Sequence, residues 1–233
     1  MATMTYCFTR SEVRPPDARK RIAVFGASGA TGQHVVRQAL ASGHRVTACV
    51  ADPAHLPLAH EALRLARADV LVPESLSGLL DGHDAVLCLV GHKREALQQS
   101  GDTPRRHPVC ARATRHLVSA MTQAGVARIV VLGAAGIGNS CATGRFGLGW
   151  GVRWFLPEVM ADKERQEALL RHSALRWTVL RPGRFNHAPA SGRIDVGEDL
   201  RWGWHSTSRE DVAALMLRLV DDPASFGKAL TVV

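Results

Sequence analysis

A glycine-rich segment after a short apolar run carries the clearest chemical signal in this chain. The apolar residues 22–25 lead into the string GASGATG at 26–32, and a helical pattern continues from 33 to 40. In such a turn Gly26 lets the strand end sharply, Gly29 leaves room for a pyrophosphate, and Gly32 lets the helix pack closely on the strand. Because the first N–H groups of a helix lack helical partners, they attract an anion. The segment predicts a dinucleotide phosphate site, and the alternative is a turn that binds nothing.

The spacing of these glycines departs from the commonest dehydrogenase fingerprint. Glycine occupies positions one, four and seven of the string, rather than one, three and six. The string resembles the turn of extended and atypical short-chain dehydrogenases/reductases. Three further segments resemble one atypical branch, the NAD(P)H-binding proteins related to biliverdin reductase B (flavin reductase) and to NmrA. These segments are ADV at 68–70, ADKERQEALL at 161–170 and WTVLRPGR at 177–184, and the resemblance runs from about residue 20 onward.

The resemblance implies a set of cofactor-binding positions beyond the glycine turn. Residues 89–91 follow an expected strand and would pass beneath the nicotinamide ribose, and residues 182–185 would frame the carboxamide. Asp69 and Val70 would lie along the adenine, although Asp69 can also cap a turn. The full cofactor set is Gly26, Ser28, Gly29, Ala30, Thr31, Gly32, Ala51, Asp69, Val70, Leu89, Val90, Gly91, Lys163, Pro182 and Phe185.

The choice between NADP(H) and NAD(H) is read at the end of the second expected strand. Many members of the family place there an arginine that pairs with the 2′-phosphate, whereas this chain has Ala51. Asp52 followed by Pro53 is typical of a helix N-cap. The resemblance favours NADP(H), with Ser28 or Arg37 as substitutes for the missing arginine, and NAD(H) stays open.

The usual catalytic pair of short-chain enzymes, Tyr-x3-Lys, is absent. Tyr6 is the only tyrosine and lies in an expected N-terminal arm, and residues 131–136 offer no hydroxyl. Lys163 is the catalytic candidate, because the resemblance places an active-site lysine at the start of its helix. There it would bind the nicotinamide ribose or donate a proton if burial lowered its pKa. The alternative is an exposed lysine that pairs with Glu167.

Seven glycines punctuate residues 133–151, a segment that also contains large aromatic side chains. It follows the fifth expected strand, on the ligand-binding edge of an open α/β sheet, and we interpret it as a substrate wall or lid. The alternative is a long loop pinned to the core by its tryptophans. Substrate-side elements are expected at 133–160 and 183–207. The expected substrate contacts are Trp150, Trp154, Arg184 and His187, and Trp202, Trp204 and His205 are near enough in the chain topology to line the same pocket.

The remainder of the chain predicts one α/β domain. Expected strands at 22–26, 45–50, 62–66, 85–89, 128–132, 176–181, 193–196 and 229–232 alternate with helices at 30–42, 53–60, 73–80, 109–124, 157–172 and 209–220. This alternation predicts a Rossmann-like, doubly wound parallel sheet with helices on both faces and a small C-terminal substrate-side subregion. We expect a single domain at 20–233 after a flexible arm at 1–19, and a capping box of Ser208 with Asp211.

Composition narrows the classes of partner. The formal charge is +8, but the basic residues are spread along the chain, so we expect no nucleic-acid partner. Scattered cysteines and histidines predict no metal site. No apolar stretch is long enough to span a bilayer and no secretion signal is recognised, so we expect a cytoplasmic protein without a membrane partner. For its oligomeric state, we expect a monomer or a homodimer.

These observations favour an NAD(P)H-dependent reductase of the atypical short-chain type. Its substrate would be a conjugated small molecule, aromatic and in some cases anionic: a flavin, tetrapyrrole, quinone or polyketide-like ring. Such substrates accept hydride and take a proton from solvent, which tolerates the missing tyrosine. Two alternatives stay open, a non-catalytic redox sensor similar to NmrA and a non-redox isomerase or cyclase on the same fold.

Overall fold

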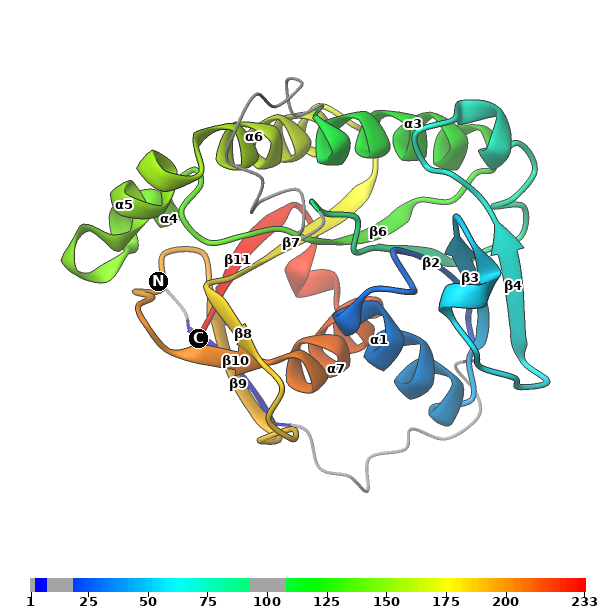
Figure 1. The fold of residues 1–233 in the computed structure, drawn as a ribbon, viewed down its shortest axis with the longest axis horizontal. Helices are drawn as coiled ribbons and strands as arrows, with labels where there is room; N and C mark the ends of the chain where they lie inside the picture. The colour runs from blue at the N-terminus through cyan, green and yellow to red at the C-terminus, as the bar shows by residue number, and fades with distance from the viewer. Residues whose placement is uncertain (1–2, 8–18, 93–107) are drawn as a thin grey trace.

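A computed structural model describes residues 3–7, 19–92 and 108–233, which form a sheet with helices on both faces (Figure 1). The nine-stranded sheet has the order β1-β9-β11-β7-β6-β5-β2-β3-β4, and a separate parallel pair joins β10 to β8. The strands are β1 Met4–Cys7, β2 Arg21–Phe25, β3 Arg45–Val50, β4 Leu63–Arg67, β5 Ala85–Cys88, β6 Arg128–Leu132, β7 Arg176–Pro182, β8 Arg184–Asn186, β9 Arg193–Gly197, β10 Ser206–Ser208 and β11 Lys228–Val232.

The helices lie on the two faces of the sheet in pairs, with α1 against α7 and α3 against α6 (Figure 1). The α-helices are α1 Ala30–Ala41, α3 Val109–Gln123, α4 Ser140–Thr143, α5 Leu148–Phe155, α6 Pro157–Arg171 and α7 Arg209–Leu219. Short 3₁₀ turns occur at η2 Pro53–His55, η3 Pro73–Leu76, η4 Arg145–Gly147 and η5 Pro223–Ser225. Within the described ranges, no helix combines the length and apolarity needed to cross a membrane.

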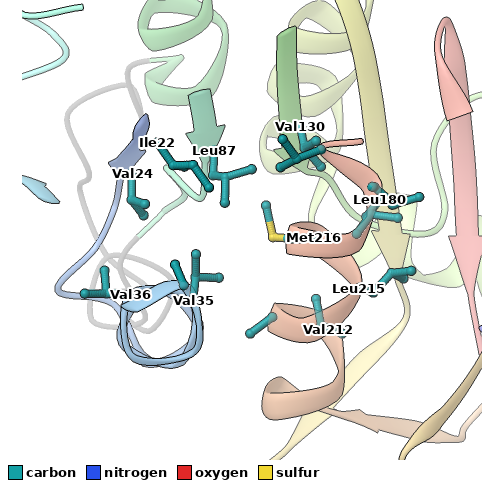
Figure 2. Close-up of a cluster of buried hydrophobic side chains, with 14 of the residues drawn as sticks. Ile22, Val24, Val35, Val36, Leu87, Val130, Leu180, Val212, Leu215 and Met216 are labelled. Atoms are coloured by element: carbon teal, nitrogen blue, oxygen red, sulfur yellow. The ribbon is translucent and has the colours of Figure 1, made fainter. Parts of the chain in front are cut away.

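Two apolar layers hold the helices on the sheet. Alternate residues of the central strands face opposite sides, so Ile22 and Val24 pack with α1 and α7 while Ala23 and Phe25 pack with α3. Figure 2 shows the first layer, in which Val35 of α1 and other side chains of both helices meet the strands. Strands buried on both faces explain the nearly continuous apolar runs of the sequence.

The expected doubly wound parallel sheet is confirmed, and its central strands lie where the sequence placed them. Three elements differ from expectation. The helix expected at 73–80 is the single turn η3, and the one expected at 53–60 is η2. The glycine-rich segment contains α4, η4 and α5 rather than a loop. Strands β8 and β10 are too short, at three residues each, to produce a recognisable alternation.

The expected flexible arm also contains an ordered element, which corrects that expectation. Residues of β1 pair antiparallel with β9, Tyr6 opposite Ile194. The Tyr6 hydroxyl donates to Asp222 Oδ2 at 2.5 Å, and burial together with this bond raises the pKa of Tyr6. Four residues give too short a pattern to reveal a strand that depends on a partner almost 190 positions away.

The final helix begins as predicted, but its expected capping box forms only in part. The Ser208 hydroxyl accepts from the Glu210 N–H, as an N-cap should. The Asp211 carboxylate instead accepts from the N–H groups of Ser191 and Gly192. Asp211 therefore fixes the turn before β9 and leaves the capping of α7 to Ser208.

Helix α6 buries polar side chains against the sheet, and one of them forms an ion pair with a strand. Glu167 accepts from Arg181 Nε at 2.7 Å and from its Nη2 at 2.5 Å, and the Arg181 side chain is completely buried. Glu167 also meets the half-exposed guanidinium of Arg171 at 3.8 Å. A bidentate buried pair of this kind fixes the helix on β7.

Replacing Glu167 with Gln should lower the free energy of unfolding by about 3–5 kcal/mol, because the buried Arg181 guanidinium loses its counter-charge. Urea denaturation measures the difference. Arg171→Ala is the control, because the guanidinium of Arg171 is half-exposed and only 3.8 Å from Glu167, and its loss leaves no buried charge; we expect a cost of about 1 kcal/mol. Equal effects of the two substitutions would contradict the assignment of the stabilisation to the buried pair.

Candidate functional site

The glycine turn between β2 and α1 is shaped so that side chains are excluded from it. A Cβ on Gly32 would lie 2.1 Å from the Gly26 carbonyl oxygen, and one on Gly26 would lie 2.8 Å from the Leu89 carbonyl carbon. Gly26 also has φ +81°, a conformation that favours glycine. Gly29 is the N-cap of α1 and no side chain caps that end of the helix. The turn therefore leaves the start of α1 without a side-chain cap, and binding of an anion there stays a prediction.

Two neighbouring side chains hold the turn. Gln33 Nε2 donates to the Ser28 carbonyl at 3.1 Å, and Arg209 Nη1 donates to Thr31 Oγ1 at 3.2 Å. The Arg209 guanidinium also lies over the Phe185 ring, 4.5 Å from its centroid. Arg209 starts α7, about 180 residues along the chain from the turn, so no local sequence pattern indicates this contact. It adds positive charge beside the predicted pyrophosphate position.

Lys163 reaches the same edge of the sheet from α6. Its ammonium donates to the Leu132 carbonyl at 2.8 Å, to Gln166 Oε1 at 3.0 Å and to the Val90 carbonyl at 3.5 Å. The residue is only 7% exposed. The alternative of an exposed lysine paired with Glu167 is wrong, because Glu167 binds Arg181 instead. Lys163 thus lies between the carboxyl ends of β5 and β6, where open α/β sheets bind ligands.

A buried group of three titratable residues surrounds the start of α3. Asp162 Oδ2 lies 2.9 Å from His92 Nε2 and accepts from the Cys110 N–H at 2.8 Å, while Oδ1 accepts from the Ala111 N–H at 2.9 Å. The carboxylate thereby caps α3 from a different helix. No local sequence pattern indicates this group, because its members belong to three separate segments and meet only in the folded chain.

Hydrogen bonding sets the charges in this group. The bond to Asp162 and then the Cys110 thiol raise the pKa of His92 to about 9, against the effect of burial. Burial opposes ionisation of Asp162, yet the bonds from His92, Ala111 and Cys110 lower the pKa of that carboxyl overall. His92 and Asp162 therefore form an imidazolium–carboxylate pair at neutral pH. Asp162 directly precedes Lys163 on α6, so the pair lies close to the lysine.

The same three side chains have the donor types of a transition-metal site. The ligand atoms of His92, Cys110 and Asp162 all lie within 4.8 Å of one another. The direct hydrogen bond between His92 and Asp162 already accounts for their approach. The absence of a metal site, expected from the sequence, stays a prediction.

The adenine-side positions behave in the structure as turn residues. Asp52 Oδ1 accepts from the Ala54 N–H at 3.0 Å, so the predicted N-cap before Pro53 is confirmed. Asp69 Oδ1 accepts from the Leu71 N–H at 2.9 Å, as a turn-capping residue does. Val70 is buried and Ala51 is exposed. Val90 and Gly91 follow β5, beside Lys163, and Pro182 ends β7.

On the expected substrate side, the tryptophans predicted to pin the segment do not do so. Trp150 is 64% and Trp154 82% exposed. Trp202 performs the anchoring instead: it is 3% exposed, and its Nε1 donates to the Ser140 carbonyl at 2.7 Å. Trp202 and Trp204 follow the segment, and Arg184 lies 5.9 Å from the Trp204 ring centroid.

The remaining substrate-side position, His187, is exposed just after β8, and Phe185 is half-buried. The structure brings Phe185 and Arg209 to the glycine turn. Trp150, Trp154 and His187 are all exposed to solvent. Their role toward a substrate stays a prediction.

Comparison with known proteins agrees with this geometry. A model of the family described as NAD(P)H-binding matches residues 26–223. An uncharacterised chloroplastic protein of Arabidopsis thaliana is 26% identical over 224 residues, which cover 89% of this chain and 74% of that protein. Cinnamoyl-CoA reductase 1 of Oryza sativa subsp. japonica is 32% identical over 126 residues, 51% of this chain and 35% of the reductase.

Solved structures share the fold at low sequence identity. A short-chain dehydrogenase/reductase of Veillonella parvula in complex with NADP has a TM-score of 0.76 and 17% identity, covering 92% of this chain and 94% of that chain. An anaerobillin reductase of Escherichia coli O157:H7 has a TM-score of 0.74 and 19% identity, covering 91% and 96%. The predicted resemblance to atypical short-chain reductases is confirmed at the level of fold and family.

Adding a methyl group to the glycine turn should weaken dinucleotide binding. For Gly32→Ala we expect a loss of about tenfold or more, because the new Cβ would force the Gly26 carbonyl to move. Gly29→Ala, with a milder approach of 3.2 Å to that carbonyl, tests the turn if the first variant fails to fold. Gly151→Ala, whose Cβ meets nothing within 4 Å, is the control. Calorimetric titration with unchanged affinities would contradict the site.

The His92–Asp162 pair should make stability depend on pH. Because the pKa of His92 is raised to about 9 in the folded chain, its contribution is complete below the unfolded pKa of about 6.5 and is lost as pH rises through 9. The loss should be on the order of 2 kcal/mol. His92→Gln should remove this slope when unfolding is measured between these pH values. Parallel pH profiles of the two proteins would refute the pairing.

Proposed function

We propose that this chain, which belongs to the NAD(P)H-binding family, is an oxidoreductase that transfers hydride from NAD(P)H to a conjugated small molecule. The observation that carries the proposal is the glycine turn, which leaves a backbone cradle that a single Cβ would fill, at the same sheet edge as buried Lys163. When bound, the dinucleotide supplies the hydride, and the protein supplies position and charge.

The residues at this edge would divide the binding of the dinucleotide between them. The N–H groups at the start of α1 would bind the pyrophosphate, with Arg209 adding positive charge beside Thr31. Lys163 is proposed to bind the nicotinamide ribose in exchange for its long bond of 3.5 Å to the Val90 carbonyl, while its bonds to the Leu132 carbonyl and to Gln166 keep the ammonium in place. We favour NADP(H), with exposed Arg37 as the residue that binds the 2′-phosphate. The Arg37 guanidinium donates to Gln33 Oε1 at 3.1 Å, which holds the side chain along the surface of α1.

His92 is our candidate for the proton source that the missing tyrosine would otherwise supply. It follows Gly91 directly, and Asp162 keeps it protonated at neutral pH. A group with a pKa near 9 gives up a proton readily enough to assist a substrate that accumulates negative charge after accepting hydride. Asp162 would then hold the neutral imidazole in one orientation until it is reprotonated from solvent.

The proposed substrate is a planar conjugated ring such as a flavin, tetrapyrrole, quinone or polyketide. Arg184 and Trp204 together present a cation beside an exposed indole face. Such a pair suits an anionic aromatic ligand, because the ring stacks while the guanidinium binds the charged substituent.

The deciding experiment is calorimetric titration with NADPH, NADP, NADH and NAD, followed by reduction assays with flavins, quinones and tetrapyrroles. Preferential binding of NADPH with turnover of one of these rings supports the proposal. Binding without turnover of any ring would instead support the redox sensor similar to NmrA. Failure of all four dinucleotides to bind would refute both readings.

Lys163→Met should lower kcat by about 100-fold while the fold persists, because methionine keeps the buried volume but cannot bind the ribose. Arg165→Ala, an exposed change on the same helix, is the control and should leave kcat unchanged. Steady-state kinetics and thermal melting separate the two effects. Full activity of the methionine variant would exclude Lys163 from the site.

A further inference from the structure

An exposed aromatic cluster is the most unusual feature of the protein surface. Phe146 is 97% exposed, Trp150 64%, Trp154 82% and Phe155 81%. The four residues fall within ten consecutive positions of η4 and α5, in a chain that has only twelve aromatic residues, six Phe, five Trp and one Tyr. Soluble proteins seldom expose contiguous apolar surface of this kind unless it contacts a partner. We call these four residues the aromatic knob.

The other side of α5 explains why the aromatic residues face outward. Gly149 packs so tightly that a Cβ there would lie 2.2 Å from the Cys141 carbonyl oxygen. Val152 and Leu156 pack against the small core formed by Ile137, Val159 and Met160. The inner face of α5 is therefore already occupied, and turning the aromatic residues inward would displace these contacts.

The knob is a projection from the molecule. Helices α4 and α5 extend from one end of the fold, at the left of Figure 1, beyond the end of α6. The Trp154 and Phe155 ring centroids are 6.0 Å apart, so the rings form a continuous apolar surface. A projecting apolar surface can enter a deformable layer such as a lipid headgroup region more easily than it can pack on the flat face of a folded protein.

Basic residues predominate within the knob, and acidic residues border it. Residues 140–157 contain Arg145 and Arg153 and neither Asp nor Glu, and exposed Glu158 follows directly. Arg145 is exposed, and its side chain lies against Gly203, next to Trp204. Arg153 pairs with Glu164 on α6, which fixes its guanidinium at the base of the knob. Exposed Arg145 and the formal net charge of +8 favour an anionic surface over a second, equally basic copy of this chain.

We propose that the aromatic knob docks the protein on an anionic lipid surface. Trp and Phe would enter the headgroup region, where aromatic rings are favoured, and Arg145 would meet the lipid phosphates. The expectation of no membrane partner rested on the lack of a spanning stretch, a criterion that does not bear on attachment to the surface. This inference does not depend on the proposed reductase activity.

Vesicle binding tests the proposal directly. The full chain should sediment with phosphatidylcholine vesicles that contain phosphatidylserine and much less with phosphatidylcholine alone. Its tryptophan fluorescence should shift to shorter wavelength and be quenched by brominated acyl chains. Trp150→Ser with Trp154→Ser should weaken binding by about tenfold or more, with unchanged thermal melting because both side chains are exposed.

A matched control separates the knob from the general positive charge of the chain. Arg45 and Arg64 line a cavity of about 730 Å³ with Arg19 and Arg21, at the opposite, amino-terminal edge of the strands. Arg45→Glu with Arg64→Glu should leave most vesicle binding intact. If this pair abolishes binding and the tryptophan pair does not, the basic edge rather than the knob is the contact.

Two other outcomes would overturn the proposal by showing a different occupant. Light scattering that reveals a dimer dissolved by the tryptophan substitutions would assign the knob to a second copy. A raised KM for a soluble substrate, without any vesicle binding by the unaltered chain, would assign it to a substrate lid. Quenching by brominated lipid that disappears in the tryptophan variant supports the lipid surface alone.

Discussion

The arrangement of the site depends on the polar face that α6 turns toward the sheet. Asp162, Lys163, Gln166 and Glu167 are each at most 7% exposed, and each has a specific partner. Asp162 holds the start of α3, Lys163 the ends of β5 and β6, and Glu167 the end of β7. Gln166 connects Lys163 to Thr114 of α3. One helix thus joins every element that carries a proposed catalytic group.

Packing through buried polar groups lowers the stability of the fold but holds the side chains of α6 in fixed positions. An apolar helix face would avoid the cost of desolvating two carboxylates and an ammonium. Apolar contacts, however, are non-directional, whereas hydrogen bonds fix atoms to within tenths of an ångström. Because each of these four side chains has a partner on a different element, a shift of the helix would break several bonds together. We infer that the ammonium and the imidazole keep their places before any ligand binds.

The sequence was sufficient for the parallel sheet and the glycine turn, since each has a local pattern of apolar periodicity or motif spacing. Lys163 was selected by the resemblance of its segment to related reductases, and its role stays a prediction. It did not reveal the partners of these residues. His92, Cys110 and Asp162 come from three segments, and Arg209 reaches Thr31 from the far end of the domain. The tryptophans misled for a physical reason: burial depends on which face of α5 meets the core, and Gly149 decides that face through backbone packing. Pairing of β1 likewise depends on β9, which no local propensity encodes.

The position of β11 in the sheet affects when this protein can fold during synthesis. Residues 228–232 lie between β7 and β9, and β9 in turn pairs with β1, so β11 completes a side of the sheet that also contains residues 4–7. Until that strand leaves the ribosome, β7 has an open edge and β1 has no stable partner. The half that contains the glycine turn, from β2 to β6, can form early. Completion of this side of the sheet must follow translation of residue 232. Before that point the edge of β7 is exposed, and chaperones can bind to such an edge.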